Sequence, residues 1–299
     1  MNTNRTKSKE AVTSVLIVLF LSAFCASLNF GNTGNRWGTA GRRGSPKAPA
    51  QGLSNVPSSF APATGRSAVL VELFTSEGCN TCPPADKLLT VLDQTQPIDG
   101  AQVIALSEHV DYWNRLGWKD PFSSAEFTQR QVDYEKVFNV EGPYTPQMVV
   151  DGHAQFVGSR VDSCREAITA AERSPKADVS IAIKTSAANS VALTVKVENV
   201  PEISHGDSAD VMVAITESGL SSNVLRGENA GQNLVHSAVT RKLFRIGSVD
   251  HKGFSAEKTV SLASNWKRAN MKAVVFIQER ASRHVIGAAA IGLGEEPSA

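Results

Sequence analysis

The 299-residue sequence has almost no excess charge of either sign, few cysteines and no series of long apolar segments. Its 30 Lys and Arg against 29 Asp and Glu give a formal net charge of +1, which argues against the basic balance of nucleic-acid-binding proteins. With 41% hydrophobic and 20% charged residues, the chain is too apolar for overall disorder and too polar for a multi-span membrane protein. Four cysteines exclude a disulfide-dense scaffold, so their spacing is more informative than their number.

A short apolar run follows basic residues near the amino terminus. Arg5, Lys7 and Lys9 precede the uncharged run 11–26, which is the order found in secretory signals. The run is short for a spanning helix, so we predict a signal peptide or membrane anchor over residues 1–28, with cleavage favoured over a retained anchor. A buried helix of a folded domain is the weakest of the three interpretations, because the run has no amphipathic pattern.

Residues 29–66 are rich in Gly, Asn, Ser, Pro and Ala. Such a composition cannot bury enough apolar surface to form a core, so the segment is predicted to be a disordered linker. The expected location of the protein is secreted or periplasmic, with membrane contact only through the N-terminal segment if it stays uncleaved. Export into an oxidising compartment would allow two close cysteines to form a disulfide.

Residues 67–175 form the first predicted folded unit, in which strands and helices alternate. The apolar run 68–74 predicts a strand covered on both faces, and Asp151-Gly152 between two apolar runs predicts a hairpin. Asp162 or Ser163 is expected to cap the last helix. The expected elements are strands over 68–74, 102–107, 147–150 and 154–157, and helices over 85–92, 125–138 and from the cap to 173.

This order, with a two-cysteine loop after the first strand, resembles the thioredoxin fold without its extra N-terminal strand. Cys79 and Cys82 are spaced as CxxC, and Thr145-Pro146 stands before the third strand. The resemblance implies that Pro146 occupies the cis-proline loop that faces the cysteines. A proline at the entry of an edge strand is also ordinary, so this signal alone is ambiguous.

The motifs also resemble those of a family of secreted bacterial proteins that is classed as a thioredoxin-like domain of unknown function. The resemblance covers about residues 67–293 and implies fold and export but no substrate. The matching segments are 74–79 (FTSEGC), 82–86 (CPPAD), 109–113 (HVDYW), 117–122 (GWKDPF), 144–147 (YTPQ), 226–231 (RGENAG) and His236.

The cysteine pair allows three kinds of chemistry. Where a CxxC pair opens a helix, the free amide groups and the helix dipole stabilise a thiolate, which is the species that attacks disulfides. Thiol–disulfide exchange, with Cys79 attacking and Cys82 resolving, is the favoured hypothesis. A structural disulfide and metal ligation by two thiolates are the alternatives.

Local sequence around the pair weakens the catalytic comparison. Gly78 stands where thioredoxins usually have Trp, and Asn80-Thr81 replaces their Gly-Pro. Pro83 disfavours helical angles at Cys82, so the helix is expected to begin at Pro83 or Pro84 with Cys82 at its cap. We therefore expect a less acidic Cys79 than in strong oxidants.

Polar residues follow the second strand at the same edge of the sheet as the cysteine loop. His109 and Asp111, with Glu108, could move protons during exchange or complete a metal site, or could instead only organise the loop that follows. The aromatic residues of that loop could line a ligand groove or fill the core beneath it; they are Tyr112, Trp113, Trp118 and Phe122. Cys164 is expected to be an unpaired, semi-buried thiol.

Residues 176–294 show clean period-two alternation and predict about seven antiparallel strands, enough for a β-sandwich. The loop 225–236 carries charged and amide side chains that could meet the cysteine unit or a ligand, although a solvated loop is the commoner case. No nucleophile-and-base pattern, phosphate loop or metal cluster is evident in this unit.

The combined prediction is an α/β thioredoxin-like domain over residues 67–175 followed by an all-β sandwich-like domain over residues 176–294. Its expected chemistry is thiol–disulfide exchange on a thiol-bearing or disulfide-bearing protein substrate, with Cys79, Cys82, Pro146, His109 and Asp111 as site residues. We expect no cofactor, no resident metal and no nucleic-acid partner. A non-catalytic envelope binding protein with a structural disulfide and a metal-handling protein are the alternatives.

Overall fold

The computed structural model describes residues 65–294. The predicted signal or anchor at 1–28, and most of the predicted linker at 29–66, lie outside the described residues. Within the described part of the chain, no helix is both long enough and apolar enough to cross a membrane.

Strands and helices alternate in the first half of the described chain, close to the bounds expected from the sequence. Its elements are β1 (Ser67–Thr75), α1 (Pro83–Thr95), β2 (Ala101–His109), the 3-10 helix η1 (Asn114–Leu116), α2 (Ala125–Phe138), β3 (Gln147–Val150), β4 (Ala154–Val157) and α3 (Val161–Ala171). Asp151 and Gly152 turn between β3 and β4 with φ of 46° and 65°, as the hairpin signal predicted. The cap prediction for α3 is wrong: Arg160 is the N-cap residue, and no side chain caps the helix.

Strands dominate the second half. Its elements are β5 (Asp178–Ala187), β6 (Ser190–Glu198), β7 (Ala209–Glu217), β8 (Leu220–Asn223), β9 (Asn233–His236), β10 (Val239–Val249), β11 (Phe254–Ser261), the 3-10 helix η2 (Arg268–Asn270), β12 (Met271–Glu279) and β13 (Val285–Gly292). The sequence predicted a polar loop over residues 225–236. The strand β8 ends just before this segment and β9 lies at its end, and the two strands pair with each other as a separate two-stranded sheet.

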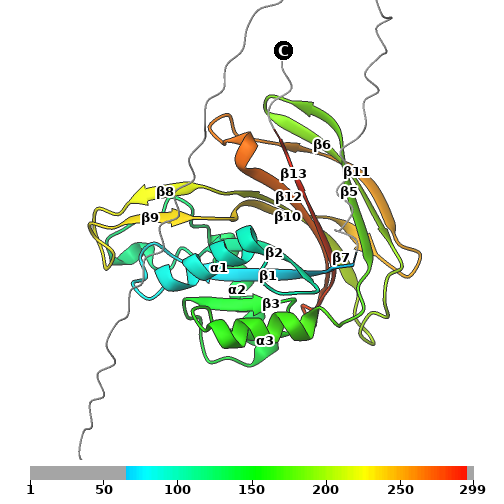
Figure 1. Ribbon diagram of the computed structural model, residues 1–299, viewed down its shortest axis with the longest axis horizontal. Coiled ribbons are helices and arrows are strands. Elements are labelled where there is room, and N and C mark those ends of the chain that lie inside the picture. The colour runs from blue at the N-terminus through cyan, green and yellow to red at the C-terminus, as the bar shows by residue number, and fades with distance from the viewer. Residues whose placement is uncertain (1–64, 295–299) are drawn as a thin grey trace, which may run out of the picture. The chain divides into compact units, whose positions relative to one another are not determined.

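One mixed sheet of eight strands joins the two halves, in the order β13-β12-β7-β10-β2-β1-β3-β4 (Figure 1). The connection is the parallel pairing of Val239 in β10 with Ser107 in β2, next to the hydrogen bond that Ser107 N donates to the Ala238 carbonyl. The predicted α/β thioredoxin-like domain followed by an all-β sandwich domain is therefore wrong. Without β10, the edge of β2 at Ser107 would be open, and the second half supplies the strand that pairs with it.

Residues of the first half alternate between the two faces of this sheet. Odd-numbered residues of β1 and β2 pack with α1 and α3, in a core that includes Val71, Leu89 and Ile168. Even-numbered residues face the side of α2, in a core that includes Leu70, Leu106 and Phe127. A neighbouring pair of residues on one strand thus serves two different environments.

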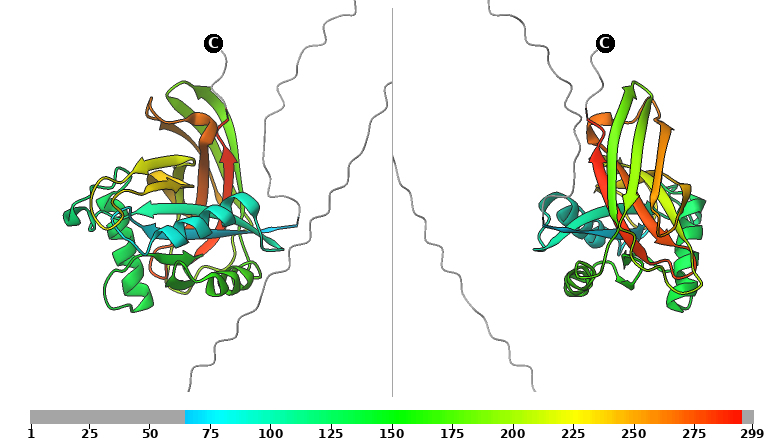
Figure 2. Two further views of the ribbon diagram at one scale, coloured as in Figure 1. Left: turned by 60° about the vertical axis from the view of Figure 1, so that its left-hand side comes forward. Right: turned by 90° about the vertical axis from the view of Figure 1, so that its right-hand side faces the viewer.

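A smaller three-stranded sheet, β11-β6-β5, packs on the second-half part of the large sheet. Figure 2 shows its green and orange strands beside the red strand β13. The apolar core that the two sheets share includes Leu193 of β6, Val213 of β7 and Val275 of β12. Period two in the sequence therefore reports correctly that these strands have one buried face, but it does not report which sheet they join.

Candidate functional site

The cysteine loop connects the carboxyl end of β1 to the start of α1. Cys79 and Cys82 form a disulfide with a Cα–Cα distance of 5.5 Å, and both residues are 0% exposed. Asn80 and Thr81 between them are exposed. Neither cysteine, including Cys79 as the expected attacking residue, is therefore accessible to a partner in this closed state.

The start of α1 offers no free amide group to a thiolate. Pro83 and Pro84 occupy the first two helical positions and carry no N–H, and the N–H groups of Ala85 and Asp86 both donate to the Cys82 carbonyl. Cys82 is the N-cap residue, as predicted, although its φ of −77° and ψ of −38° are helical, contrary to the expected effect of Pro83. The usual stabilisation of a thiolate at a helix N-terminus is therefore weak here.

The loop between β8 and β9 covers the cysteine loop. The side-chain amide of Asn229 donates to the carbonyls of Glu77, at 2.9 Å, and of Cys79, at 3.0 Å. The Glu228 carboxylate accepts from the Asn80 N–H at 3.1 Å. Of the two interpretations of the loop 225–236, contact with the cysteine loop is the one that the structure shows, and Asn229 is buried by it.

Glu77 connects the cysteine loop to two other segments. Its carboxylate accepts from Trp118 Nε1 at 2.8 Å and from His236 Nε2 at 3.1 Å. Its N–H donates to Asp120 Oδ2 at 2.9 Å. Glu77 is 0% exposed, so the carboxylate depends on these partners instead of water. The loop, β9 and the segment after β2 are thus held at one point.

A second carboxylate–imidazole pair lies beside the first. His109 Nδ1 lies 2.7 Å from Asp120 Oδ2, and the His109 and His236 rings contact edge to face with centroids 4.8 Å apart. Burial lowers the pKa of His109, but the carboxylates of Asp120, Asp86 and Glu77 outweigh burial and raise it above the ordinary value. Burial opposes ionisation of Asp120, yet His109 and backbone N–H groups lower the pKa of Asp120 overall.

Asp86 in the first turn of α1 completes the group. Thr75 donates to Asp86 Oδ1 at 2.9 Å, and the residue is 7% exposed. Burial raises the pKa of Asp86, and the nearby His236 and His109 only partly oppose this effect. We call Glu77, Asp86, His109, Asp120 and His236 the histidine cluster. It contains two carboxylate–imidazole pairs and a further carboxylate, all buried beside the disulfide.

The structure places Pro146 near the cysteine loop and Asp111 elsewhere. The Thr145–Pro146 bond is cis, and Pro146 is buried next to Gln147, which pairs with Phe74 near the end of β1. Asp111 instead accepts a hydrogen bond from the Thr128 hydroxyl of α2 at 2.6 Å. This contact agrees with the second of the two roles considered for Asp111, which was to organise the loop after β2 and not to transfer protons or bind a metal.

The aromatic residues of the segment 112–122 fill space around the cysteine loop. A Cβ at Gly78 would lie 3.1 Å from the Trp113 Cβ, so glycine allows Trp113 to pack closely here. Trp113 Nε1 donates to Thr145 Oγ1 at 2.8 Å, and Phe122 contacts the His109 and His236 rings. This geometry favours core filling over a ligand groove for these side chains.

Cys164 lies apart from the disulfide in the core between α3 and the sheet. It is free and 1% exposed, which confirms the unpaired thiol and shows deeper burial than expected. Burial raises the pKa of Cys164 to about 12. It has the properties of a small apolar core residue and not those of a reactive thiol.

Sequence reasoning did not identify Glu77 and Asp120 as parts of the site, whereas Asn229 lies in the loop 225–236 for which contact with the cysteine unit was one of the expectations. Glu77 and Asp120 stand in the quoted motifs next to cysteine and tryptophan, but no spacing rule connects them. Asn229 reaches the Cys79 carbonyl across 150 residues of sequence. Within residues 65–294, no group of three or more His, Cys, Asp or Glu side chains is arranged to hold a metal ion.

Comparisons with known proteins identify the family. Residues 70–278 match the family described as a protein of unknown function, DUF1223, and the chain belongs to this family. A crystal structure of a protein from Agrobacterium tumefaciens is 28% identical, with a TM-score of 0.59 and coverage of 79% of this chain and 99% of that one. HBP35 of Porphyromonas gingivalis is 15% identical, with a TM-score of 0.57 and 78% of each chain covered, which indicates a similar fold. None of the curated proteins matches the chain.

Proposed function

We propose that this DUF1223 protein performs reversible thiol–disulfide exchange at Cys79 and Cys82, with a cysteine-containing polypeptide as its partner. The observation that carries the proposal is the position of the disulfide, between the end of β1 and the start of α1 and beside the buried histidine cluster. Burying several ionisable groups is costly. A disulfide that only closes a four-residue loop would need no such cluster.

The proposed location is secreted or periplasmic. The basic residues followed by the apolar run 11–26 support this proposal, because they have the order of a secretory signal. The Cys79–Cys82 disulfide supports it as well, since disulfides persist mainly in oxidising compartments.

The exchange step begins with the reduced pair. The Cys79 thiolate attacks one sulfur of a client disulfide, and the other client sulfur leaves as a thiolate and takes up a proton. Cys82 then loses its proton and attacks Cys79 Sγ, which releases the second client thiol. The client gains two electrons, and the protein ends with the disulfide of this structure. A dithiol donor returns the pair to the reduced state.

The side chain of Thr81 favours Cys79 as the attacking residue. The Thr81 hydroxyl lies 3.4 Å from Cys79 Sγ and can donate to a thiolate there. Asn229 holds the Cys79 carbonyl from a loop that belongs to the other half of the sequence. Because both sulfurs are 0% exposed, exchange requires the loop between β8 and β9 to move away from the cysteine loop.

A structural disulfide in a non-catalytic binding protein is the second candidate. The full burial of both cysteines favours it, because exchange needs access to a sulfur. In that case the pair pins the cysteine loop to α1, and the histidine cluster serves another purpose. The metal-handling alternative has less support, since the described residues contain no group of three suitable ligands.

The test is exchange with a peptide disulfide. The purified protein is reduced, freed of reductant and mixed with a peptide that contains one internal disulfide, and peptide thiols are followed by alkylation and mass spectrometry. We expect one peptide disulfide to be reduced per protein, with re-formation of the Cys79–Cys82 bond. Cys164→Ala is the matched control and should react as the wild type does, because Cys164 is remote and buried. A reduced protein that closes its own disulfide without reducing the peptide contradicts the proposal.

A further inference from the structure

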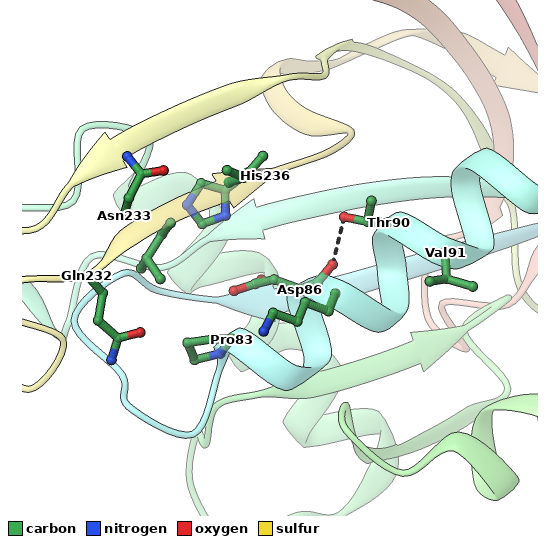
Figure 3. Close-up of a pocket in the computed structure, with 10 residues that line it drawn as sticks. Pro83, Asp86, Thr90, Val91, Gln232, Asn233 and His236 are labelled. Atoms are coloured by element: carbon green, nitrogen blue, oxygen red, sulfur yellow. Dashed lines mark hydrogen bonds between the residues drawn. The ribbon is translucent and has the colours of Figure 1, made fainter. Parts of the chain in front are cut away.

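A groove of about 380 Å³ lies between α1 and β9, directly beside the histidine cluster. Asp86 and His236 both line it, and Figure 3 shows their side chains between the helix and the strand. Apolar side chains form much of the rest of its wall; they are Pro83, Val91, Leu234 and Val235. The groove therefore combines an apolar wall with two buried polar groups, which is the usual character of a small-ligand site.

The two polar groups present hydrogen-bond acceptors. His236 Nε2 faces the Glu77 carboxylate, which can only accept, so Nε2 carries the hydrogen. With the hydrogen on Nε2, Nδ1 is the acceptor of the ring, and it is buried without a partner among residues 65–294 although His236 is only 1% exposed. The Thr75 hydroxyl occupies Asp86 Oδ1, which leaves Oδ2 for a ligand.

The local charge is negative and lacks a fixed cation. Among residues 65–294, the ion pairs of Glu77 and Asp120 are with His236 and His109, and no Lys or Arg lies within ion-pair distance of Asp86. Lys87 also lines the groove, but it is exposed and forms no ion pair with Asp86. Buried carboxylates in native proteins are normally paired, so the groove has an unfilled position for a positive group.

We propose that this groove binds a primary ammonium group carried on an aliphatic chain. The ammonium has three hydrogen-bond donors and no acceptor, which matches Asp86 Oδ2 and His236 Nδ1. The methylene groups of the chain pack along Val91, Leu234 and Val235. The site involves neither sulfur atom, so it does not depend on the exchange reaction.

Two sources supply this chemistry, namely a free small diamine and a lysine side chain of a polypeptide. Calorimetric titration of the full chain with 1,5-diaminopentane and with a lysine amide acetylated at its α-amino group distinguishes them. Tighter binding of the diamine indicates a free amine as the natural ligand, and tighter binding of the lysine derivative indicates a polypeptide. Pentane-1,5-diol is the uncharged comparison and should not bind.

Asp86→Asn tests the carboxylate, because it keeps the shape and the acceptor for Thr75 but removes the charge. We expect affinity for the diamine to fall at least about tenfold. Asp93→Asn is the matched control on the same helix, since Asp93 pairs with Lys272 at 2.7 Å and does not line this groove. Its affinity should equal that of the wild type.

Val91→Lys gives a second test that does not change the buried cluster. Val91 is 47% exposed, so the variant should fold, and its ammonium group should weaken diamine binding by repulsion. Val137→Lys is the matched control, on α2 and 37% exposed. The proposal is overturned if the diol binds as well as the diamine, if Asp86→Asn keeps full affinity, or if no saturable binding is seen up to about 1 mM diamine.

Discussion

Two buried polar clusters lie on opposite faces of the large sheet. Glu108 belongs to one and His109 to the other, because these two residues are neighbours on β2 and successive side chains of a strand point to opposite faces. The histidine cluster lies on the side of α1. On the side of α2 lies a second cluster, which we call the arginine cluster; it consists of Glu72, Glu108, Arg130, Tyr134 and Gln278. Both clusters join the two halves of the sequence, since Gln278 and His236 come from the second half.

The two clusters differ in how their carboxylates are compensated. Arg130 lies 2.6 Å from Glu72 and 3.5 Å from Glu108, and its guanidinium is always charged. Burial and the neighbouring Glu72 raise the pKa of Glu108 well above its ordinary value, and Arg130 opposes this shift only in part. In the histidine cluster the ion-pair partners of Glu77 and Asp120 are imidazoles, which lack the permanent charge of a guanidinium.

From this difference we expect the two clusters to have different roles. A fixed guanidinium neutralises its surroundings permanently and leaves little for a ligand to do. Titratable imidazoles with free ring nitrogens leave acceptors and negative charge beside the groove and the disulfide. We therefore expect substitutions in the arginine cluster to affect mainly stability, and those in the histidine cluster to affect chemistry more than stability.

The largest expected effect is that of Arg130→Met. The substitution leaves Glu72 buried without its cation, so the free energy of unfolding should fall by about 3–5 kcal/mol. Denaturant unfolding followed by circular dichroism measures it. Arg165→Met, in an exposed pair with Asp162, is the control and should change stability by less than about 0.5 kcal/mol. A loss below about 1 kcal/mol for Arg130→Met would show that this cluster is not the structural one.

Glu77→Gln should have a smaller effect on stability. The carboxylate accepts from His236 and Trp118, whereas the amide can accept only through its single oxygen and leaves one of these donors unpaired. We expect the free energy of unfolding to fall by about 1–2 kcal/mol. The exposed Glu166→Gln is the control. A loss as large as that of Arg130→Met would remove the distinction between the two clusters.

Asn229→Ala should change reactivity more than stability. The side chain holds the carbonyls of Glu77 and Cys79 beneath the loop between β8 and β9. Losing these bonds lowers the cost of opening by about 1.4 kcal/mol, so reduction of the disulfide by dithiothreitol should become about tenfold faster. Asn223→Ala removes an exposed amide pair with Asn233 from the same hairpin and should leave the rate unchanged. Equal rates for all three proteins would show that this loop does not control access.

The smallest expected effect is on the titration of His109. Its pKa is above the ordinary value of 6.5 because nearby carboxylates outweigh burial. The stability that it contributes is therefore complete below pH 6.5 and is lost as pH rises through its folded pKa. Asp120→Asn removes the carboxylate that raises this pKa most, so the pKa of His109 should fall. Proton NMR of the imidazole resonances checks this, and an unchanged pKa would contradict the proposed pairing.

Local elements were largely predictable because local chemistry determines them. The run 68–74 lies within β1, the expected helix 125–138 matches α2, and Ser124 accepts from Glu126 N–H as an N-cap. The Asp-Gly turn gave the β3–β4 hairpin. Period-two patterns in the second half predicted about seven strands, whereas the described residues form nine there, β5 to β13.

Long-range pairing was not predictable, and it determines the fold class. The pairing of Val239 with Ser107, at a single register position, continues the sheet from one half into the other. No property of either residue in the sequence predicts this pairing. The strands β8 and β9 span four residues each and carry polar side chains, so they have no strong periodic signal. The expected separation into two architectures failed for these reasons.

The cysteine pair was found from its spacing alone, whereas most of its surroundings were not. In the sequence, Glu77 cannot be distinguished from a solvent-exposed polar residue of a loop. Its hydrogen-bond partners, Trp118 and His236, lie 41 and 159 residues away. His109 was recognised because it follows a strand at the same sheet edge as the cysteines. Asp111 was predicted as a site residue for the same reason, but its carboxylate accepts a hydrogen bond from Thr128 of α2. A position after the end of a strand therefore does not determine which way the side chain points.

The most direct test of the proposed exchange function is the reduction potential of the Cys79–Cys82 pair in the purified protein, measured by equilibration with glutathione buffers. We predict a value between about −200 and −270 mV, at the reducing end of exchange catalysts, because the start of α1 offers no free amide to stabilise a thiolate. A value below about −300 mV would contradict the proposal and identify the disulfide as a structural one.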